Sequence, residues 1–442
     1  MNPLTQLKKI LILPLLIALA LVMRAAPAAA QANEVTNWNQ IATNTLVAFP
    51  AAAGGAASAL QVNMAMPQGA VYDAVNAIEP RHQAYLLTTQ FNPTASKEAA
   101  VATAGYRVLS NIVQTVPPSI PFPNRRALQE SLNAAYDASL NAIPNGEAKT
   151  EGIAAGNAAA DAMITARQND GRFGPSPWVP NYEPGHWQPL LNPDGTLQLD
   201  PTAWVANVRP FLIQSPSQFR TDGPNALTSD AYAEDFNEVK ALGRIDSATR
   251  TAEQTHITLF WGQNAGGPAL LWNRVARNLV ADPTYGVDIG DSALLFAMLN
   301  LSAADAVINC WNDKYYWDFW RPWAAIQRAD EDGNPDTEPD PSWTALLTAP
   351  YPDHPSGHLS LDGAVLEVLQ MFFGTDKIPF DVTSSRFPNE PRHYDRFSHA
   401  LKEIIGARIW AGLHYRTADV QAQILGRKVV HYMSKHYFQP VQ

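Results

Sequence analysis

Residues 290–312 read GDSALLFAMLNLSAADAVINCWN, a largely apolar run with the repeat of an α-helix. The same periodicity of about 3.6 residues recurs along the chain, whereas alternating strand patterns bounded by hairpin turns are nearly absent. The sequence therefore predicts a mainly α protein with a helical bundle at its centre. The other expected helices cover Ala56–Ala77, Lys97–Val113, Arg126–Ala142, Lys149–Arg167, Ala231–Leu242, Arg250–Phe260, Ala269–Val280, Gly357–Phe373, Tyr394–Ala411 and Val420–His436.

Two loops interrupt this helical pattern. Asp170–Pro224 is rich in Pro, Gly, Trp, Asn and Gln, and so long a loop in a compact domain is usually functional or covers another part. We expect it to wrap the bundle; an inert surface excursion is the alternative. The loop DEDGNPDTEPD at 330–340 resembles a calcium loop, but Pro335 replaces the required glycine and Pro341 the bidentate acid. We interpret it as a solvated turn, with a calcium site as the less favoured alternative.

The N-terminus has the pattern of a secretory signal. Lys8 and Lys9 precede an apolar run, Ile10–Met23, and a small-residue cleavage site ends at Ala30. The run is shorter than the roughly 20 residues of a membrane-spanning helix, which favours cleavage over an uncleaved anchor. No later stretch is expected to be long and apolar enough to span a bilayer. The prediction is a secreted or periplasmic protein with no stable membrane span after signal cleavage.

Residues 31–442 are expected to form a single large α-helical domain, with the motif-bearing catalytic core at about 225–442. Removal of residues 1–30 takes away three cationic residues and no acid, so the net charge changes from −10 to −13. So acidic a protein is a poor partner for nucleic acid, which binds cationic surfaces. Cys310 is the only cysteine, which excludes an intrachain disulfide and a multi-cysteine metal site. We expect it to be a buried small hydrophobe.

The functional signal is concentrated in three segments of the last third. The first is KYYWDFWRP at 314–322, where Lys314 and Arg321 are two helical turns apart and are expected on one helix face. Two cations among aromatic residues are unfavourable unless an anion lies between them. A surface face with snorkelling side chains is the alternative. Pro322 is expected to end or bend this helix.

The second segment, YPDHPSGH at 351–358, precedes an apolar helical pattern. Ser356 is expected at the helix N-cap, where the first backbone N–H groups attract an anion. Gly357 lets the backbone approach an oxygen closely. His358 can donate to one ligand oxygen or shuttle protons.

The third segment, RIWAGLHYRTAD at 408–419, places Gly412 at a natural helix end. Arg408 and His414 are six residues apart and do not share a face of one regular helix. His414, just past the end, is free to turn back towards Arg408. Thr417 or Asp419 is expected to cap the next helix.

Together the segments supply three cations, two hydroxyl or backbone donors and two histidines. Arginine forks and a lysine point charge suit a tetrahedral oxyanion, vanadate or phosphate. A site for a naked transition-metal cation would instead need several His and carboxylate ligands without adjacent cations. The candidate oxyanion-binding residues are Lys314, Arg321, Ser356, Gly357 and Arg408, with His358 and His414 beside them.

The order Lys-x6-Arg-Pro, Pro-Ser-Gly-His and Arg-x5-His resembles the superfamily of vanadium-dependent haloperoxidases and type 2 phosphatidic-acid-phosphatase-like acid phosphatases. The resemblance is strongest over about Ser302–Val430 and extends from roughly Pro184 onward. It implies a helical bundle of that type, vanadate as cofactor, and hydrogen peroxide and halide, or a phosphomonoester, as substrates. It implies that His414 bonds vanadium or attacks phosphorus, that His358 is the acid–base group, and that Lys314 polarises bound peroxide.

Two features bear on which reaction the resemblance implies. Trp311 matches the tryptophan that family haloperoxidases carry three residues before the lysine, and Tyr351 stands where they carry Phe or His. Both are halide-site candidates, and Tyr351 leaves the choice of halide open. Many members place an aspartate four residues after the last histidine, where this chain has Ala418 followed by Asp419, which weakens the phosphatase interpretation.

A vanadate-dependent haloperoxidase is therefore the preferred hypothesis. An exported acid phosphatase that works through a phosphohistidine is the alternative. A non-catalytic oxyanion-binding protein is the third hypothesis. A homo-oligomer is compatible with each of them.

Overall fold

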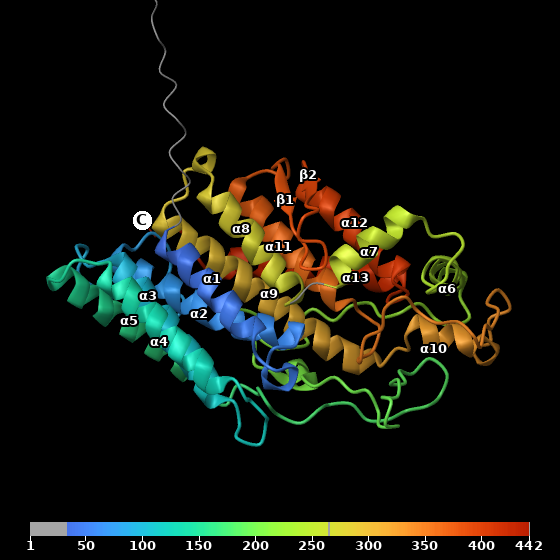
Figure 1. Ribbon diagram of the computed structural model, residues 1–442. Coiled ribbons are helices and arrows are strands. Elements are labelled where there is room, and N and C mark those ends of the chain that lie inside the picture. Colours follow the sequence, from blue (N-terminus) through green and yellow to red (C-terminus); the bar gives the residue numbers. More distant parts are fainter. Residues whose placement is uncertain (1–32, 264–265, 442) are drawn as a thin grey trace, which may run out of the picture.

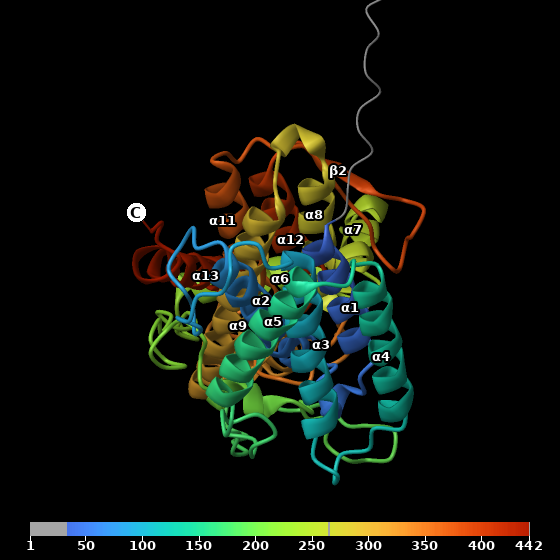
Figure 2. The same ribbon diagram turned by 90° about the vertical axis from the view of Figure 1, so that its left-hand side faces the viewer.

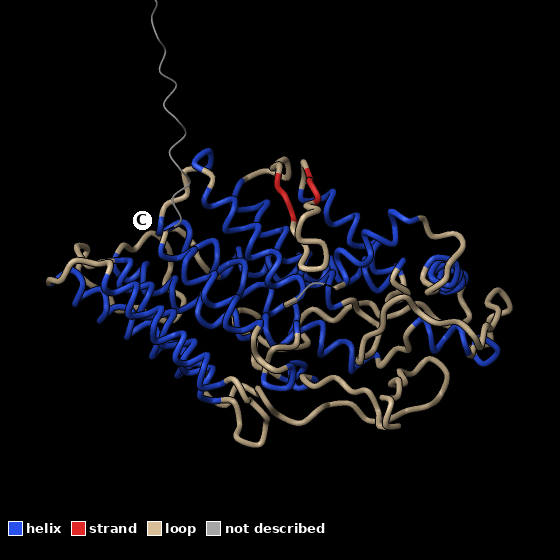
Figure 3. The backbone as a smooth tube through the Cα atoms, in the orientation of Figure 1, coloured by secondary structure: helices blue, strands red, loops and turns tan. Residues whose placement is uncertain are grey.

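The computed structural model describes residues 33–263 and 266–441 (Figure 1). Over these ranges the regular structure comprises thirteen α-helices, four short 3₁₀ helices and one two-stranded sheet. Helices dominate the tube drawing, where the sheet occupies one small edge (Figure 3). The predicted mainly α fold is confirmed. The expected signal sequence at residues 1–30 lies outside the described residues.

The centre of the molecule is α9 (Ile289–Trp317), which packs most extensively against α2 (Ala57–Ile78) and α11 (Gly357–Phe373). Every residue of α9 from Ser292 to Trp311 is buried. By length and composition alone, α9 is long and apolar enough to cross a membrane. This finding corrects the expectation that no stretch after the signal sequence would be long and apolar enough to do so. Its apolar surface is covered on all sides by other parts of the chain, as in the core helix of a globular fold.

Three helices pack against α2 on the side away from α11, and a fourth, α4, packs on α3 and α1; together they form one end of the molecule (Figure 2). Two of them, α3 and α5, approach closely because glycines lie at their contact. A Cβ on Gly152 would lie 2.2 Å from the carbonyl oxygen of Ser96, and one on Gly156 would lie 2.5 Å from that of Ala100. These helices are α1 (Glu34–Val47), α3 (Lys97–Thr115), α4 (Arg125–Asn141) and α5 (Glu147–Ala166).

The long loop wraps the bundle as expected, and α9 holds it in place. Asp305 accepts the backbone N–H groups of Phe211, Leu212 and Ile213 at 2.6, 2.6 and 2.8 Å. One and two turns further along α9, Asn309 accepts from the backbone of Phe219 at 3.0 Å and Asp313 from that of Thr221 at 2.8 Å. Residues four apart lie on one helix face. We call Asp305, Asn309 and Asp313 the acceptor row.

Of the remaining helices, α8, α12 and α13 pack against α11, whereas α6, α7 and α10 extend towards the opposite end of the molecule (Figure 1). The antiparallel pair β1 (Phe380–Val382) and β2 (Arg392–Tyr394) joins α11 to α12. The described core has two clusters, a large one around α9 and a smaller one that includes Trp320 and Trp343; Tyr351 packs against both. The remaining helices are α6 (Asp230–Leu242), α7 (Ala252–Gly262), α8 (Gly267–Ala281), α10 (Pro322–Gln327), α12 (Phe397–Trp410) and α13 (Arg416–His436).

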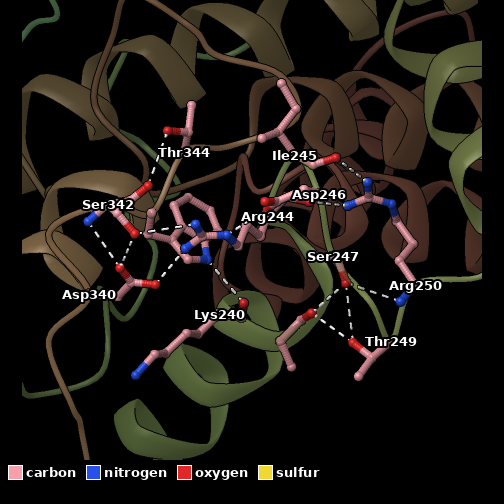
Figure 4. A network of polar contacts seen from close by, with 12 residues as sticks. Lys240, Arg244, Ile245, Asp246, Ser247, Thr249, Arg250, Asp340, Ser342 and Thr344 are labelled. Carbon is pink, nitrogen blue, oxygen red and sulfur yellow. Dashed lines mark hydrogen bonds and ion pairs between the residues drawn. The ribbon is translucent and has the colours of Figure 1, made fainter.

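A polar network joins the connection between α6 and α7 to the loop at 340–344 (Figure 4). The Arg250 guanidinium donates to the carbonyl oxygens of Leu242 and Arg244, both at 2.7 Å, and to that of Trp410 at 3.2 Å. Two backbones touch here, because a Cβ on Gly243 would lie 2.5 Å from Gly412 Cα. Gly412 has φ +73°, the left-handed conformation expected just past a helix end. The network therefore holds the turn that follows Arg408.

The predicted helix carrying both Lys314 and Arg321 is wrong. Helix α9 ends at Trp317 because Asp318 adopts a left-handed conformation with φ +46°, and Arg321 becomes the N-cap of α10. Pro322 begins α10 instead of ending α9, since a missing N–H costs nothing at the first position of a helix. The hairpin and the helices α1 and α10 also lie outside the expected elements.

Two smaller expectations also differ from the structure. The N-cap of α13 is Tyr415, whose side chain makes no capping bond, instead of Thr417 or Asp419. The loop at 330–340 closes on itself, since the Asp332 carboxylate accepts the Thr337 hydroxyl at 2.9 Å and the Asn334 N–H at 2.8 Å. Asp332 is buried, so this turn is not solvated throughout. The expected burial of Cys310 is confirmed.

Candidate active site

The three sequence segments meet at one small cavity between α2, α8, α9, α11 and α12. Its volume is about 60 Å³, which suits a compact ligand. The first turns of α2, at Ala57 and Ser58, and of α8, at Pro268, complete the wall. Three helix N-termini, counting that of α11, therefore bring their positive ends to the cavity. Its other principal lining residues are Trp311, Tyr351, Gly357, His358, Arg408 and His414.

Lys314 lies in the last turn of α9 and is fully buried. Its ammonium donates to the carbonyl oxygens of Pro352, Asp353 and Pro355 at 3.0, 2.9 and 2.5 Å. Because an ammonium has three N–H donors, all of them serve the turn before α11 in this arrangement. Lys314 thus fixes the shape of that turn and supplies positive charge behind it.

Arg321 is fully buried and ties two segments of the site together. Its Nε donates to the Tyr351 carbonyl at 2.9 Å and its Nη1 to the Leu413 carbonyl at 2.6 Å. Nη1 also lies 3.4 and 3.3 Å from the two ring nitrogens of His414. Nη2 is buried without a hydrogen-bond partner among the described residues. One N–H group of the guanidinium is therefore unsatisfied, a state that costs free energy unless a ligand accepts from it.

Ser356 is the N-cap of α11, as predicted, although its hydroxyl makes no capping bond. Its backbone N–H donates to the Ala418 carbonyl at 3.1 Å, so the N–H groups that a helix start leaves available begin with Gly357. A Cβ on Gly357 would lie 2.6 Å from the Trp311 ring and 3.7 Å from Lys314 Cε. Only glycine fits between these side chains.

His414 has a carboxylate partner that the sequence interpretation missed. Asp353 Oδ1 lies 2.7 Å from His414 Nδ1, and both residues are buried. Asp353 belongs to the turn that Lys314 holds, five residues before His358. Asp419, the acid nearest to His414 in sequence, is buried beside Ser356 and Arg408 instead. The one sequence feature that could have indicated this role is the position of Asp353 within the second motif, YPDHPSGH.

His358 and Arg408 line the same cavity from α11 and α12. His358 Nε2 is 3.5 Å from Asp362 Oδ2, and no closer hydrogen-bond partner for this nitrogen occurs in the described part of the chain. Arg408 is buried, and its Nε also has no partner among residues 33–263 and 266–441. Arg408 and His414 do converge across the turn at Gly412, since both border the cavity.

The two halide-site candidates lie against each other on the cavity wall. The rings of Trp311 and Tyr351 are 5.1 Å apart, and the Lys314 ammonium lies 5.2 Å from the Tyr351 ring centre. Trp311 Nε1 donates to Asp200 Oδ2 at 2.8 Å. Asp200 comes from the wrapping loop, so this loop contributes to the position of a cavity-lining ring.

Burial controls the protonation of the site. It lowers the pKa of Lys314 to about 7 and raises the pKa of Asp353 to about 7. It also lowers the pKa of His358 and of His414 well below the usual histidine value, and neighbouring guanidinium groups add to both shifts. Every cation here is thus disfavoured by desolvation. A bound anion would favour the charged forms of Lys314 and of both histidines.

The C-terminal third of the chain matches a known domain family. Residues 294–442 fit the family model described as the VCPO second helical-bundle domain. The matched segment contains all nine predicted site residues, which lie on α9, α11, α12 and the connections between them.

Whole-chain comparisons extend the likeness beyond that domain. A vanadium chloroperoxidase of Curvularia inaequalis is 26% identical over 415 residues, an alignment that covers 74% of this chain and 67% of that protein. A bacterial vanadium-dependent iodoperoxidase superposes with a TM-score of 0.70 at 22% identity, covering 92% of this chain and 98% of that one. The holo form of a bacterial vanadium-dependent chloroperoxidase gives 0.64 at 17% identity over 93% and 94%. The resemblance drawn from the three motifs is confirmed, and the fold is that of the vanadium haloperoxidases.

Proposed function

We propose that this protein is a vanadate-dependent haloperoxidase that oxidises halide with hydrogen peroxide. The observation that carries the proposal is the small cavity bordered by two histidines and Arg408, with Arg321 and Lys314 buried directly behind it. The fold it shares with vanadium chloroperoxidases and an iodoperoxidase supports the same assignment.

The donor set fits an oxyanion. Buried N–H groups of Arg321 and Arg408 have no partner in the described chain, and Gly357 leaves the start of α11 open to a close approach. We assign His414 as the residue that bonds the vanadium of vanadate, and Arg321, Arg408, Ser356, Gly357 and Lys314 as the groups that balance and hold its oxygens. Bound vanadate supplies a Lewis acid that activates peroxide towards a halide.

The side chains of the site have distinct tasks in this proposal. Asp353 keeps a proton on His414 Nδ1, which leaves Nε2 with its lone pair. His358 gives or takes a proton at the peroxide oxygens. Lys314 adds positive charge that polarises bound peroxide, and Trp311 and Tyr351 exclude water where we place the halide. The identity of the halide stays open.

A peroxide assay of protein loaded with orthovanadate tests the proposal. We expect bromide oxidation that requires both vanadate and peroxide, and that His414→Ala abolishes. Hydrolysis of a phosphomonoester is measured beside it. Activity in neither assay, together with tight vanadate binding, would assign the chain to the non-catalytic oxyanion binders. Full activity of His414→Ala in either assay would contradict its role.

An acid phosphatase remains the second candidate, and one observation favours it. A histidine nucleophile is helped by a carboxylate on its other nitrogen, and Asp353 occupies that position at 2.7 Å. In this alternative His414 attacks the phosphomonoester, His358 protonates the leaving oxygen, and the cations stabilise the transferring group. The phosphomonoester arm of the same experiment decides between the two.

Export and the state of assembly belong to the proposal as well. We propose cleavage near residue 30 and a secreted or periplasmic protein, since an oxidising product is safest outside the cytoplasm. The single-domain organisation of residues 31–442, with a catalytic core at about 225–442, and the lack of nucleic-acid partners remain predictions. So do the absence of a stable membrane span after cleavage and the compatibility with a homo-oligomer.

A further inference from the structure

A buried carboxylate stands directly behind His358. Asp362 follows His358 by four residues on α11, so the two side chains share a helix face. Asp362 is fully buried, and its Oδ2 lies 3.5 Å from His358 Nε2. Neither of these two atoms has a hydrogen-bond partner among the described residues. Among the described residues, His358 Nε2 and Asp362 Oδ2 are therefore two unpaired polar atoms that face each other.

The orientation of this carboxylate is set from a different helix. Trp272 on α8 donates from Nε1 to Asp362 Oδ1 at 2.6 Å. Trp272 is itself fully buried and packs near the Trp261 ring, with the ring centres 6.0 Å apart. With Oδ1 engaged and the indole held in the core, Oδ2 is directed towards the histidine.

The energetics favour a hydrogen bond between the pair. A buried imidazole N–H and a buried carboxyl oxygen are each destabilising when left unpaired. The 3.5 Å separation exceeds a good N–H···O distance of about 2.9 Å by an amount that a small side-chain rotation removes. Catalytic hydrogen bonds are often this long without ligand and shorten when one binds. Burial raises the pKa of Asp362 to about 8, whereas the Trp272 hydrogen bond and the Arg408 guanidinium, which faces the pair from α12, favour its ionised form.

We propose that Asp362 is a positioning residue that holds the His358 ring with its Nε2 proton directed at the carboxylate, so that Nδ1 is the nitrogen that serves the ligand. This inference rests on the proposed function, in which His358 is the acid–base group. The Trp272–Asp362–His358 chain links the core of α8 to the cavity. A proton taken from or given to the ligand then moves at Nδ1 only, while Nε2 keeps its own.

Asp362→Asn is the sharpest test because it is isosteric. The amide oxygen can still accept from Trp272, but the amide NH₂ now faces His358 Nε2 and favours the opposite tautomer. We expect kcat to fall by roughly 10- to 100-fold, the usual cost of losing a residue that orients a catalytic group. The dissociation constant for inorganic phosphate, measured by calorimetry, should change by less than about threefold, because Asp362 does not line the cavity.

A double-mutant cycle separates positioning from a merely structural role. In a His358→Ala background, Asp362→Asn should lower kcat no further, since there is no ring left to orient. Equal losses in both backgrounds would overturn the proposal. Trp272→Phe removes the hydrogen bond that orients the carboxylate, so we expect kcat to fall in the same direction but by less than in Asp362→Asn; an unchanged kcat would mean that Trp272 does not orient Asp362.

A second readout needs no activity. Nitrogen-15 NMR of histidine-labelled protein distinguishes the two ring tautomers, with the His358 signals assigned from His358→Ala. We expect the Nε2-protonated form in the unmodified chain and the Nδ1-protonated form in Asp362→Asn. If the tautomer is the same in both proteins, Asp362 does not position His358. This arm is independent of whether halide oxidation or phosphate-ester hydrolysis is found, so failure of the proposed function is distinguishable from failure of this inference.

Discussion

The group best placed to direct His414 is a neighbouring carboxylate. Asp353 Oδ1 lies 2.7 Å from Nδ1 of His414, whereas Asp419, the acid nearest in sequence, lies by Ser356 and Arg408. We expect Asp353→Asn to weaken vanadate binding or lower kcat by about 10- to 100-fold, because loss of a partner behind a metal-bonding histidine has that cost. Asp419→Asn should have a smaller effect. Vanadate titration and steady-state kinetics measure both; the reverse order of effects would return the role to Asp419.

The close approach of the Trp311 ring explains why residue 357 is a glycine. A methyl group there would lie 2.6 Å from the Trp311 ring, so Gly357→Ala must push the ring into the cavity or shift the start of α11. We expect a loss of about 1–3 kcal/mol in the free energy of unfolding, the usual cost of overpacking, and at least tenfold weaker vanadate binding. Denaturant unfolding and calorimetry measure the two. Gly357→Ala combined with Trp311→Phe should recover part of the stability, and no recovery would mean that the ring is not the obstacle.

At the scale of elements, the acceptor row of α9 explains how an extended loop stays on the bundle. Burial raises the pKa of Asp305 to about 6 although three N–H groups donate to it. An unfolded aspartate has a pKa near 3.9. Between pH 3.9 and 6 the folded state therefore binds more protons than the unfolded state. As the pH rises through this range, the contribution of Asp305 to the free energy of unfolding falls by up to about 3 kcal/mol. Asp305→Asn should therefore destabilise the protein more at pH 4 than at pH 7 in denaturant unfolding. Asn309→Ala, on the same row, is the control: its cost of about 1 kcal/mol should not depend on pH, and a flat difference for Asp305→Asn would contradict the assignment.

The same scale shows what the sequence could predict. Long amphipathic or apolar patterns located eleven helices, with α11 at its observed bounds, because their periodicity is read within one segment. The break at Asp318 left no such signal, since aspartate adopts a left-handed conformation only where the fold requires it. Helix α10 and the strands of the hairpin have six and three residues, too few for a period. The partners of the site residues, Asp353, Asp362 and Asp200, depend on contacts between segments, which no local pattern encodes.

At the scale of the whole molecule, a strongly acidic chain encloses a cationic cavity, and this arrangement has a measurable consequence. Arg408 and Arg321 carry buried N–H groups without partners in the described chain, and these groups are free to donate to an oxyanion. Binding stabilises by about 2.7 kcal/mol at a ligand concentration of 100 Kd. Orthovanadate and phosphate should therefore raise the Tm, and sodium chloride at equal ionic strength should not. Arg408→Met should abolish this gain, and we expect only a small change in the Tm without ligand, because the lost attraction to Asp419 and Asp362 is offset by removal of a buried charge. A ligand-free Tm that falls by many degrees, with the vanadate gain preserved, would mean that Arg408 serves the fold and not the anion.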